Sequence, residues 1–177
     1  PRSTLFPFTT LFRSRGETPF FIILDRITDV RNLGAIARSA ECAGAHGIVI
    51  PEKGSAPVNA DAVKTSAGAL ANIPVHRSPN LKNTIDYLKS SGLSIVAASE
   101  KGTTPYYSAS LNCPLAVIMG SEEDGVSPEY LKKCDQVVNI PMRGSTGSLN
   151  VSVAAGILLF EARSEEHTSE LQSPNTI

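Results

Sequence analysis

Short apolar runs recur along the middle of the chain. Most are rich in β-branched or aromatic residues and too short for a helix, so each predicts a buried strand. The predicted strands are residues 20–24, 47–50, 73–76, 94–98, 115–119 and 137–140.

Between these runs, apolar residues recur at helical spacing. The first helix is expected from Asn32, with Gly44 placed to end it. The other predicted helices are residues 60–70, 81–89, 128–133 and 149–162. Because strands and helices alternate, the pattern predicts an α/β domain with a largely parallel sheet covered on both faces.

Charge and composition limit the classes of partner that this chain is expected to bind. The 16 Lys and Arg residues nearly balance the 17 Asp and Glu residues, so nucleic-acid binding would need a local basic patch, a second copy or a further domain. The three cysteines lie far apart, without metal-ligand spacing, which predicts reduced thiols and no metal. No apolar run is long enough to span a bilayer, and no signal peptide is recognisable, so we expect a cytoplasmic protein without a membrane partner.

The pattern of apolar and polar residues at the two ends of the chain differs from the pattern in the middle. Residues 4–14 and 163–173 resemble translations of the adapter sequences used in DNA sequencing libraries. We therefore expect residues 1–14 and 163–177 to be non-native and the domain to occupy residues 15–162. The native chain would then have been cut at both ends.

Polar and glycine residues follow three of the predicted strands, where ligands gather in parallel sheets. The first segment holds Asn32 and Arg38. Taken alone, Asn32 could be a helix N-cap and Arg38 a solvated helix arginine.

The second segment runs from Met119 to Gly125, where two glycines flank the acids at positions 122–124. Glycines permit a positive φ and a close approach of backbone to a ligand. The adjacent acids repel one another unless something binds them, and the alternative is an acidic surface turn. Neither a phosphate loop nor a dinucleotide-binding glycine pattern is present.

The third segment, residues 140–152, is a polar, glycine-containing loop that leads into the apolar last helix. Ser148 and Asn150 are placed to cap that helix.

The segments NLGAIARSAECAG, IMGSEEDG and IPMRGSTGSLNVSVAAGILLFEA resemble, in this order, the three motifs of the SpoU/TrmH family of RNA ribose 2'-O-methyltransferases. The similarity covers nearly all of residues 20–162 and is greatest to 23S rRNA guanosine-2'-O-methyltransferases. It implies a SPOUT fold, in which a Rossmann-like sheet ends in a C-terminal deep trefoil knot. General topology rules would have argued against a knot.

The resemblance also implies roles for individual residues. The positions matching the family's S-adenosylmethionine site are Met119, Gly120, Gly125, Ile140, Met142, Ser148, Leu149 and Asn150. The positions matching its catalytic residues are Asn32, Arg38, Glu122, Ser148 and Asn150. The family usually has glycine where this chain has Glu123, which changes the local charge. Asn32 and Ser148 are expected to orient the ribose, and Glu122 to hold Arg38 or Asn32.

The implied activity is methylation of a ribose 2'-OH in RNA, most of all a guanosine of 23S rRNA. A tRNA ribose methyltransferase and a resistance-type rRNA methyltransferase share the same motifs, and a non-catalytic RNA-binding knot module is a further alternative. An oxidoreductase is disfavoured by the missing glycine pattern. Many relatives carry an N-terminal RNA-binding domain, which is not in this sequence.

A homodimer is expected for two reasons. The last helix is apolar around most of its circumference, more than one contact face requires. A second copy would also bring together the cations near the motifs, which are Arg26, Arg31, Arg38 and Arg143.

Overall fold

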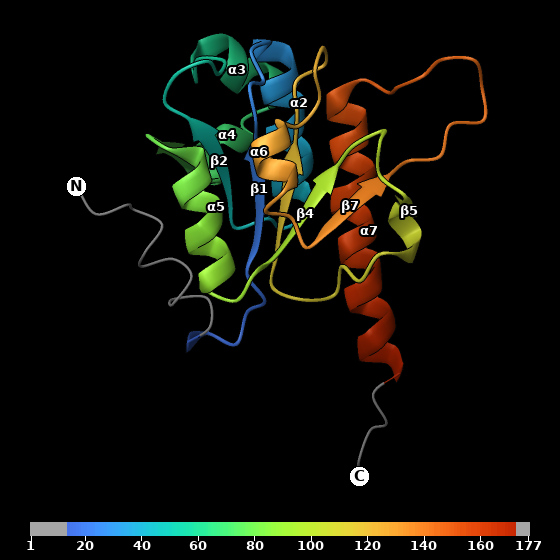
Figure 1. Cartoon of the computed structure of the whole chain (residues 1–177). Helices are drawn as coiled ribbons and strands as arrows, with labels where there is room; N and C mark the ends of the chain where they lie inside the picture. Colours follow the sequence, from blue (N-terminus) through green and yellow to red (C-terminus); the bar gives the residue numbers. More distant parts are fainter. Residues whose placement is uncertain (1–13, 173–177) are drawn as a thin grey trace.

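The computed structural model describes residues 14–172, with side chains described as far as Ser164. One sheet of seven strands has the order β3-β2-β1-β6-β4-β7-β5, and all of its pairings are parallel (Figure 1). The strands are β1 (Phe20–Leu24), β2 (Gly47–Pro51), β3 (Val75–Ser78), β4 (Ser94–Ala98), β5 (Thr104–Pro105), β6 (Leu115–Met119) and β7 (Gln136–Asn139). The predicted α/β class and parallel sheet are confirmed.

Helices cover both faces of the sheet. The helices are α2 (Val30–Cys42), α3 (Ala60–Thr65), α4 (Ala69–Asn72), α5 (Leu81–Ser90), α6 (Pro128–Leu131) and α7 (Val151–Gln172), with a 3-10 turn at Tyr106–Ser108. Alternate residues of β1 point to opposite faces of the sheet, and each face has its own hydrophobic cluster. Phe20, Ile22 and Leu24 pack in the cluster of α2 and α7. Phe21 and Ile23 pack in the cluster of α5 and α6 on the other face.

The structure corrects several predicted boundaries. Helix α2 begins at Val30 and is capped by Asp29, whose carboxylate accepts from the Arg31 amide, so Asn32 is not the N-cap. The helix predicted at residues 60–70 is split into α3 and α4, because Ala67 and Gly68 have positive φ values of 51° and 88°.

Other elements are shifted or were missed. Strand β3 begins two residues later than expected, and helix α7 begins at Val151 rather than at residue 149. The two-residue strand β5 was not predicted, because a pairing this short leaves no periodicity in the sequence.

Helix α7 continues past Ala162, the predicted end of the domain, without a break. Arg163 donates from Nε to the Ala43 carbonyl and from Nη2 to the Gly44 carbonyl, each at 2.6 Å. Its guanidinium also lies 5.1 Å from the ring centre of Phe20. These contacts hold the end of α2 against α7. Among the described residues, no helix is long and apolar enough to cross a membrane.

Candidate active site

Two of the three predicted site segments follow strands that are neighbours in the sheet. Strands β1 and β6 pair in register, with Leu24 opposite Met119, and the Asp25 amide donates to the Met119 carbonyl at 2.8 Å. The two segments that leave these strands therefore start side by side. Helix α7 packs against α2, which brings the start of the last helix to the same region.

The side chain of Asn150 joins three predicted catalytic residues. Its Nδ2 donates to Oδ1 of Asn32 at 3.0 Å and to Oε1 of Glu122 at 2.9 Å. Asn32 is buried, with 7% of its surface exposed, whereas Glu122 is exposed. One residue from each of the three sequence segments thus meets in a single cluster (Asn32, Glu122 and Asn150).

Asn150 also caps helix α7. Its Oδ1 accepts from the Ser152 amide at 2.9 Å and from the Ser152 hydroxyl at 2.5 Å, which confirms the predicted cap at this residue. Ser148 is exposed and makes no hydrogen bond within the described part of the chain, so the structure gives it no capping role.

Arg38 does not join the cluster within one chain. It lies six residues after Asn32 on α2, which is about 120° away around the helix axis. Its side chain is exposed and has no ion pair among residues 14–164. Glu122, which was expected to hold Arg38 or Asn32, is linked to Asn32 through Asn150, whose Nδ2 donates to both side chains.

The acidic loop (residues 120–125) is closed on itself. Ser121 and Gly125 form an antiparallel bridge, and a Cβ at position 120 would lie 2.0 Å from the Gly125 carbonyl carbon. Gly125 has a positive φ of 70° with open space where a Cβ would be. Both glycines are thus required by the shape of the loop, and the positive φ of Gly125 is one of the two reasons for which glycine was expected here.

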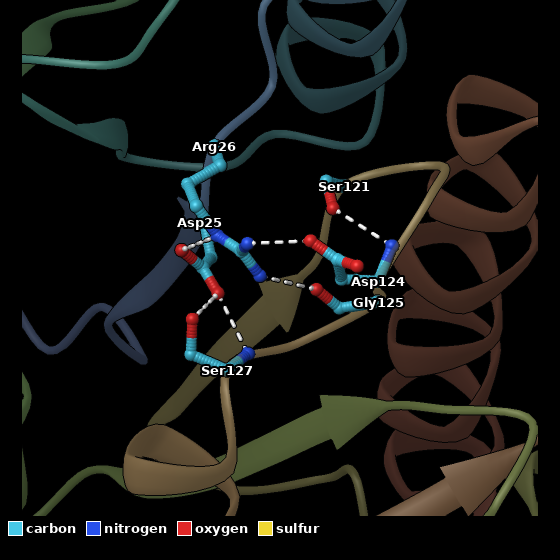
Figure 2. A network of polar contacts seen from close by, with 6 residues as sticks. All are labelled: Asp25, Arg26, Ser121, Asp124, Gly125 and Ser127. Carbon is cyan, nitrogen blue, oxygen red and sulfur yellow. Dashed lines mark hydrogen bonds and ion pairs between the residues drawn. The ribbon is translucent and has the colours of Figure 1, made fainter.

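Sequence reasoning missed the polar contacts that attach the acidic loop to β1 (Figure 2). Asp25 is 2% exposed, and its Oδ2 accepts from the amide and hydroxyl of Ser127 at 2.7 and 2.6 Å. Arg26 pairs with Asp25 at 3.2 Å and with Asp124 at 2.8 Å. Partial burial opposes its charge, but the hydrogen bonds to Asp25 and Asp124 raise the pKa of Arg26.

Two of the four arginines expected to meet RNA are paired within the chain. Arg26 contacts Asp25 and Asp124, and Arg31 pairs with Asp29 at 3.0 Å. The hydrogen bonds from Arg31 lower the pKa of Asp29. The other two, Arg38 and Arg143, are exposed and have no ion pair in the part of the chain whose side chains are described.

The residues matching the donor site fall on two segments. Met119, Gly120 and Gly125 belong to β6 and the acidic loop, and Met119 is buried. The remaining donor positions belong to the connecting loop (residues 140–150), which leads from β7 to α7 and projects from the body of the domain (Figure 1). Met142 and Leu149 are 36% and 39% exposed there. Apolar side chains of this kind fit the face of an adenosyl group.

No group of three His, Cys, Asp or Glu side chains within the described residues could hold a metal ion. Polar contacts in the site are instead made by amides, hydroxyls, carboxylates and arginines. Such groups can orient a polar substrate and stabilise developing negative charge.

Comparison with known proteins agrees with this geometry. The model of the SpoU rRNA Methylase family matches residues 19–160. The 23S rRNA (guanosine-2'-O-)-methyltransferase RlmB of Vibrio parahaemolyticus is 44% identical over 149 residues, which cover 84% of this chain and 60% of that protein. The chain spans about 60% of the length of the curated relatives it matches.

Solved structures match the fold. The SpoU methyltransferase AviRb from Streptomyces viridochromogenes superposes with a TM-score of 0.81 at 30% identity, covering 86% of this chain and 61% of that one. The same enzyme in complex with the cofactor AdoMet gives a TM-score of 0.79 at 30% identity, covering 85% and 59%. By sequence, by fold and by the order of its motifs, the chain belongs to the SpoU rRNA methylase family.

Proposed function

We propose that this chain is the catalytic domain of an S-adenosylmethionine-dependent RNA ribose 2'-O-methyltransferase, with a guanosine of 23S rRNA as its target. The observation that carries the proposal is the amide of Asn150, which donates to Asn32, 118 residues away in sequence, at 3.0 Å and to Glu122, 28 residues away, at 2.9 Å. The name of the Vibrio relative supports the substrate. A non-catalytic module would have no need of this cluster. A ribosomal substrate would place the enzyme in the cytoplasm.

The AdoMet complex of the Streptomyces relative supports the donor. Ile140, Met142 and Leu149 would form the apolar wall of the donor site, and the backbone of the acidic loop would form its other side. When bound, S-adenosylmethionine supplies a methyl group activated by a sulfonium. A pocket with little water favours a reaction in which that positive charge is lost.

The residues of the chain would act on the ribose. Asn32 and Ser148 are polar groups suited to orient the 2'-OH, and Asn150 holds Asn32 through a direct hydrogen bond. Arg38 would stabilise the developing alkoxide and a neighbouring phosphate, because an arginine stays protonated at neutral pH and offers several donors. Proton removal is left unassigned.

We further propose a homodimer in which the connecting loop takes part in the trefoil knot of the family. Val153 and Phe160 lie seven residues apart on one face of α7 and are 51% and 52% exposed. Together with Met142 and Leu149 they leave apolar side chains exposed on α7 and on the connecting loop. A second copy would cover this surface and could supply Arg38 to the cluster of its partner. Sedimentation at micromolar concentration that shows only an active monomer would refute the dimer.

Methyl transfer and donor binding test the main proposal. The full chain should bind S-adenosylhomocysteine without added metal and transfer a methyl group to 23S rRNA, and Leu149→Arg should block binding. Arg38→Ala should lower turnover by about 10²–10³, the scale of one lost electrostatic donor, and leave donor affinity nearly unchanged. Arg77→Ala, which removes an exposed arginine of β3, is the matched control. Folded protein that binds no donor, or Arg38→Ala with full turnover, would contradict the assignment.

A further inference from the structure

Arg26 occupies a backbone conformation that is unfavourable for its residue type. Its φ is +59°, in the left-handed region that glycine adopts without cost and that a residue with a Cβ adopts only at a cost in free energy. In the described chain, Ala67 is the one other non-glycine residue with a positive φ. The surrounding structure must offset this strain, and the contacts of the Arg26 side chain are part of that structure.

Those contacts connect the end of β1 to the C-terminal end of the acidic loop. The guanidinium donates from Nε to Asp25 Oδ1 at 3.2 Å, from Nη1 to Asp124 Oδ2 at 2.8 Å and from Nη2 to the Gly125 carbonyl at 3.2 Å (Figure 2). Asp25 is in turn fixed by the amide and hydroxyl of Ser127. The planar guanidinium of Arg26 thus links the end of β1 to a loop about a hundred residues away in sequence.

The acidic loop carries Glu122, two residues before Asp124. The loop is closed by the amides of Asp124 and Gly125, which donate to the hydroxyl and the carbonyl of Ser121 at 3.2 and 3.0 Å. Because the loop is short and closed, fixing Asp124 and Gly125 also fixes Glu122, whose Oε1 accepts from Asn150. Arg26 also neutralises one of three adjacent carboxylates, which lowers the repulsion that would otherwise push Glu122 away.

We propose that Arg26 is a positioning residue for the reaction. Acting through Asp124 and Gly125, it holds the acidic loop in the geometry in which Glu122 meets Asn150. This inference rests on the proposed function for its effect on turnover, but its effect on the loop is independent of any activity.

The test compares Arg26→Gly with Asp124→Asn in the full chain. Glycine accepts the positive φ, so Arg26→Gly removes the side chain without breaking the backbone turn. Asp124→Asn weakens the same ion pair and leaves position 26 unchanged. Glu123→Gln is the control, because it removes a charge from the same loop at an exposed residue whose side chain has no ion pair among the described residues.

Hydrogen–deuterium exchange gives the readout that needs no catalysis. In Arg26→Gly the Gly125 amide should exchange about tenfold faster, the scale of a coupling within one ion-pair network, and Asp124→Asn should do the same. Glu123→Gln should leave that rate near the wild-type value. Exchange at the wild-type rate in both Arg26→Gly and Asp124→Asn overturns the proposal, whether or not the chain methylates RNA.

Turnover then separates positioning from a general loss of stability. Arg26→Gly should lower kcat about tenfold when Glu122 is present, but should have almost no further effect in a Glu122→Ala background, because Arg26 acts through Glu122. An equal loss in both backgrounds overturns the positioning role. Absence of methyl transfer by the wild-type chain would instead count against the proposed function and leave the exchange result to decide the role of Arg26.

Discussion

Two loops carry most of the residues of the candidate site, and they are built differently. The acidic loop is closed by the Ser121–Gly125 bridge and attached to β1 through Arg26. In the connecting loop, residues 141–150 are all exposed, and Asn150 supplies the side-chain contacts to the rest of the site. The fold therefore holds the acidic loop by its own contacts, and we expect the connecting loop to become ordered only when a ligand binds.

The difference follows from where the loops start and how long they are. The acidic loop leaves β6, which lies between β1 and β4 near the middle of the sheet, so neighbouring segments surround it. The connecting loop leaves β7, one strand from the edge of the sheet, and its length carries it away from the other strands. A short loop that returns on itself can satisfy its own backbone groups, whereas a long exposed one relies on solvent or on partners.

Adding a methyl group at a glycine should give the largest contrast between the loops. Gly120→Ala would place a Cβ 2.0 Å from the Gly125 carbonyl carbon, so the acidic loop cannot keep its path. We expect a loss of about 4 kcal/mol or more in the free energy of unfolding, measured by denaturant titration. Gly147→Ala, where a Cβ meets nothing within 4 Å, should change stability by less than about 0.5 kcal/mol. Equal effects would show that the loops do not differ in rigidity.

Removing the buried carboxylate of Asp25 should give the next largest effect. Asp25→Ala leaves the Ser127 amide and hydroxyl without their acceptor and removes one of the three acceptors of the Arg26 guanidinium. We expect a loss of about 2–3 kcal/mol in the free energy of unfolding, together with faster exchange in the acidic loop. Glu123→Ala, an exposed acid of the same loop, should cost less than about 0.5 kcal/mol. A neutral Asp25→Ala would mean that this attachment contributes nothing to the fold.

Within the connecting loop, two predicted catalytic residues should differ in how much they contribute to the free energy of unfolding. Asn150→Ala removes the cap of α7 and the links to Asn32 and Glu122, which should cost about 1 kcal/mol. Ser148→Ala should leave the unfolding free energy unchanged within about 0.5 kcal/mol, although both variants should lose turnover. A destabilised Ser148→Ala variant would indicate a structural contact that this structure does not contain.

The smallest effect concerns pH. The hydrogen bonds from Arg31 hold the pKa of Asp29 below its usual 3.8 in the folded chain, so the pair stabilises the fold above that pH and the contribution is lost as the pH falls through the folded value. Asp29→Asn keeps a capping side chain but not the charge. Its stability should therefore fall less steeply below pH 3.8 than that of the wild type. Parallel curves in acid titrations followed by circular dichroism would rule out this contribution.

Much of the fold could be predicted because parallel strands covered on both faces leave continuous apolar runs in the sequence. Strands β1, β4 and β6 lie where these runs predicted them. Contacts between residues that are far apart in the sequence leave no such local pattern. Nothing near Arg26 in sequence indicates that it pairs with Asp124, because their proximity depends on β1 and β6 being neighbours in the sheet.

In the candidate site, too, some features could be predicted from the sequence and others depend on contacts that the sequence does not reveal. Motif order predicted that Asn32, Glu122 and Asn150 belong to one site, and the structure joins them. The sequence indicated that glycine at position 120 allows a close approach or a positive φ, but not that the close approach is to the backbone of Gly125. Arg38 matches the family as well as Asn32 does, yet helical geometry turns it to another side of α2 within one chain.

Hydrogen–deuterium exchange of the two loops, with and without S-adenosylhomocysteine, tests most directly whether half of the site is built before the ligand binds. Without ligand, the amides of residues 120–125 should already be protected and those of residues 141–149 should exchange rapidly. With saturating ligand, protection should rise in residues 141–149 and change little in residues 120–125. Equal protection of both loops without ligand, or no gain in residues 141–149 when ligand is bound, would contradict this account. The account requires that the acidic loop is formed before the ligand binds and that the ligand orders the connecting loop.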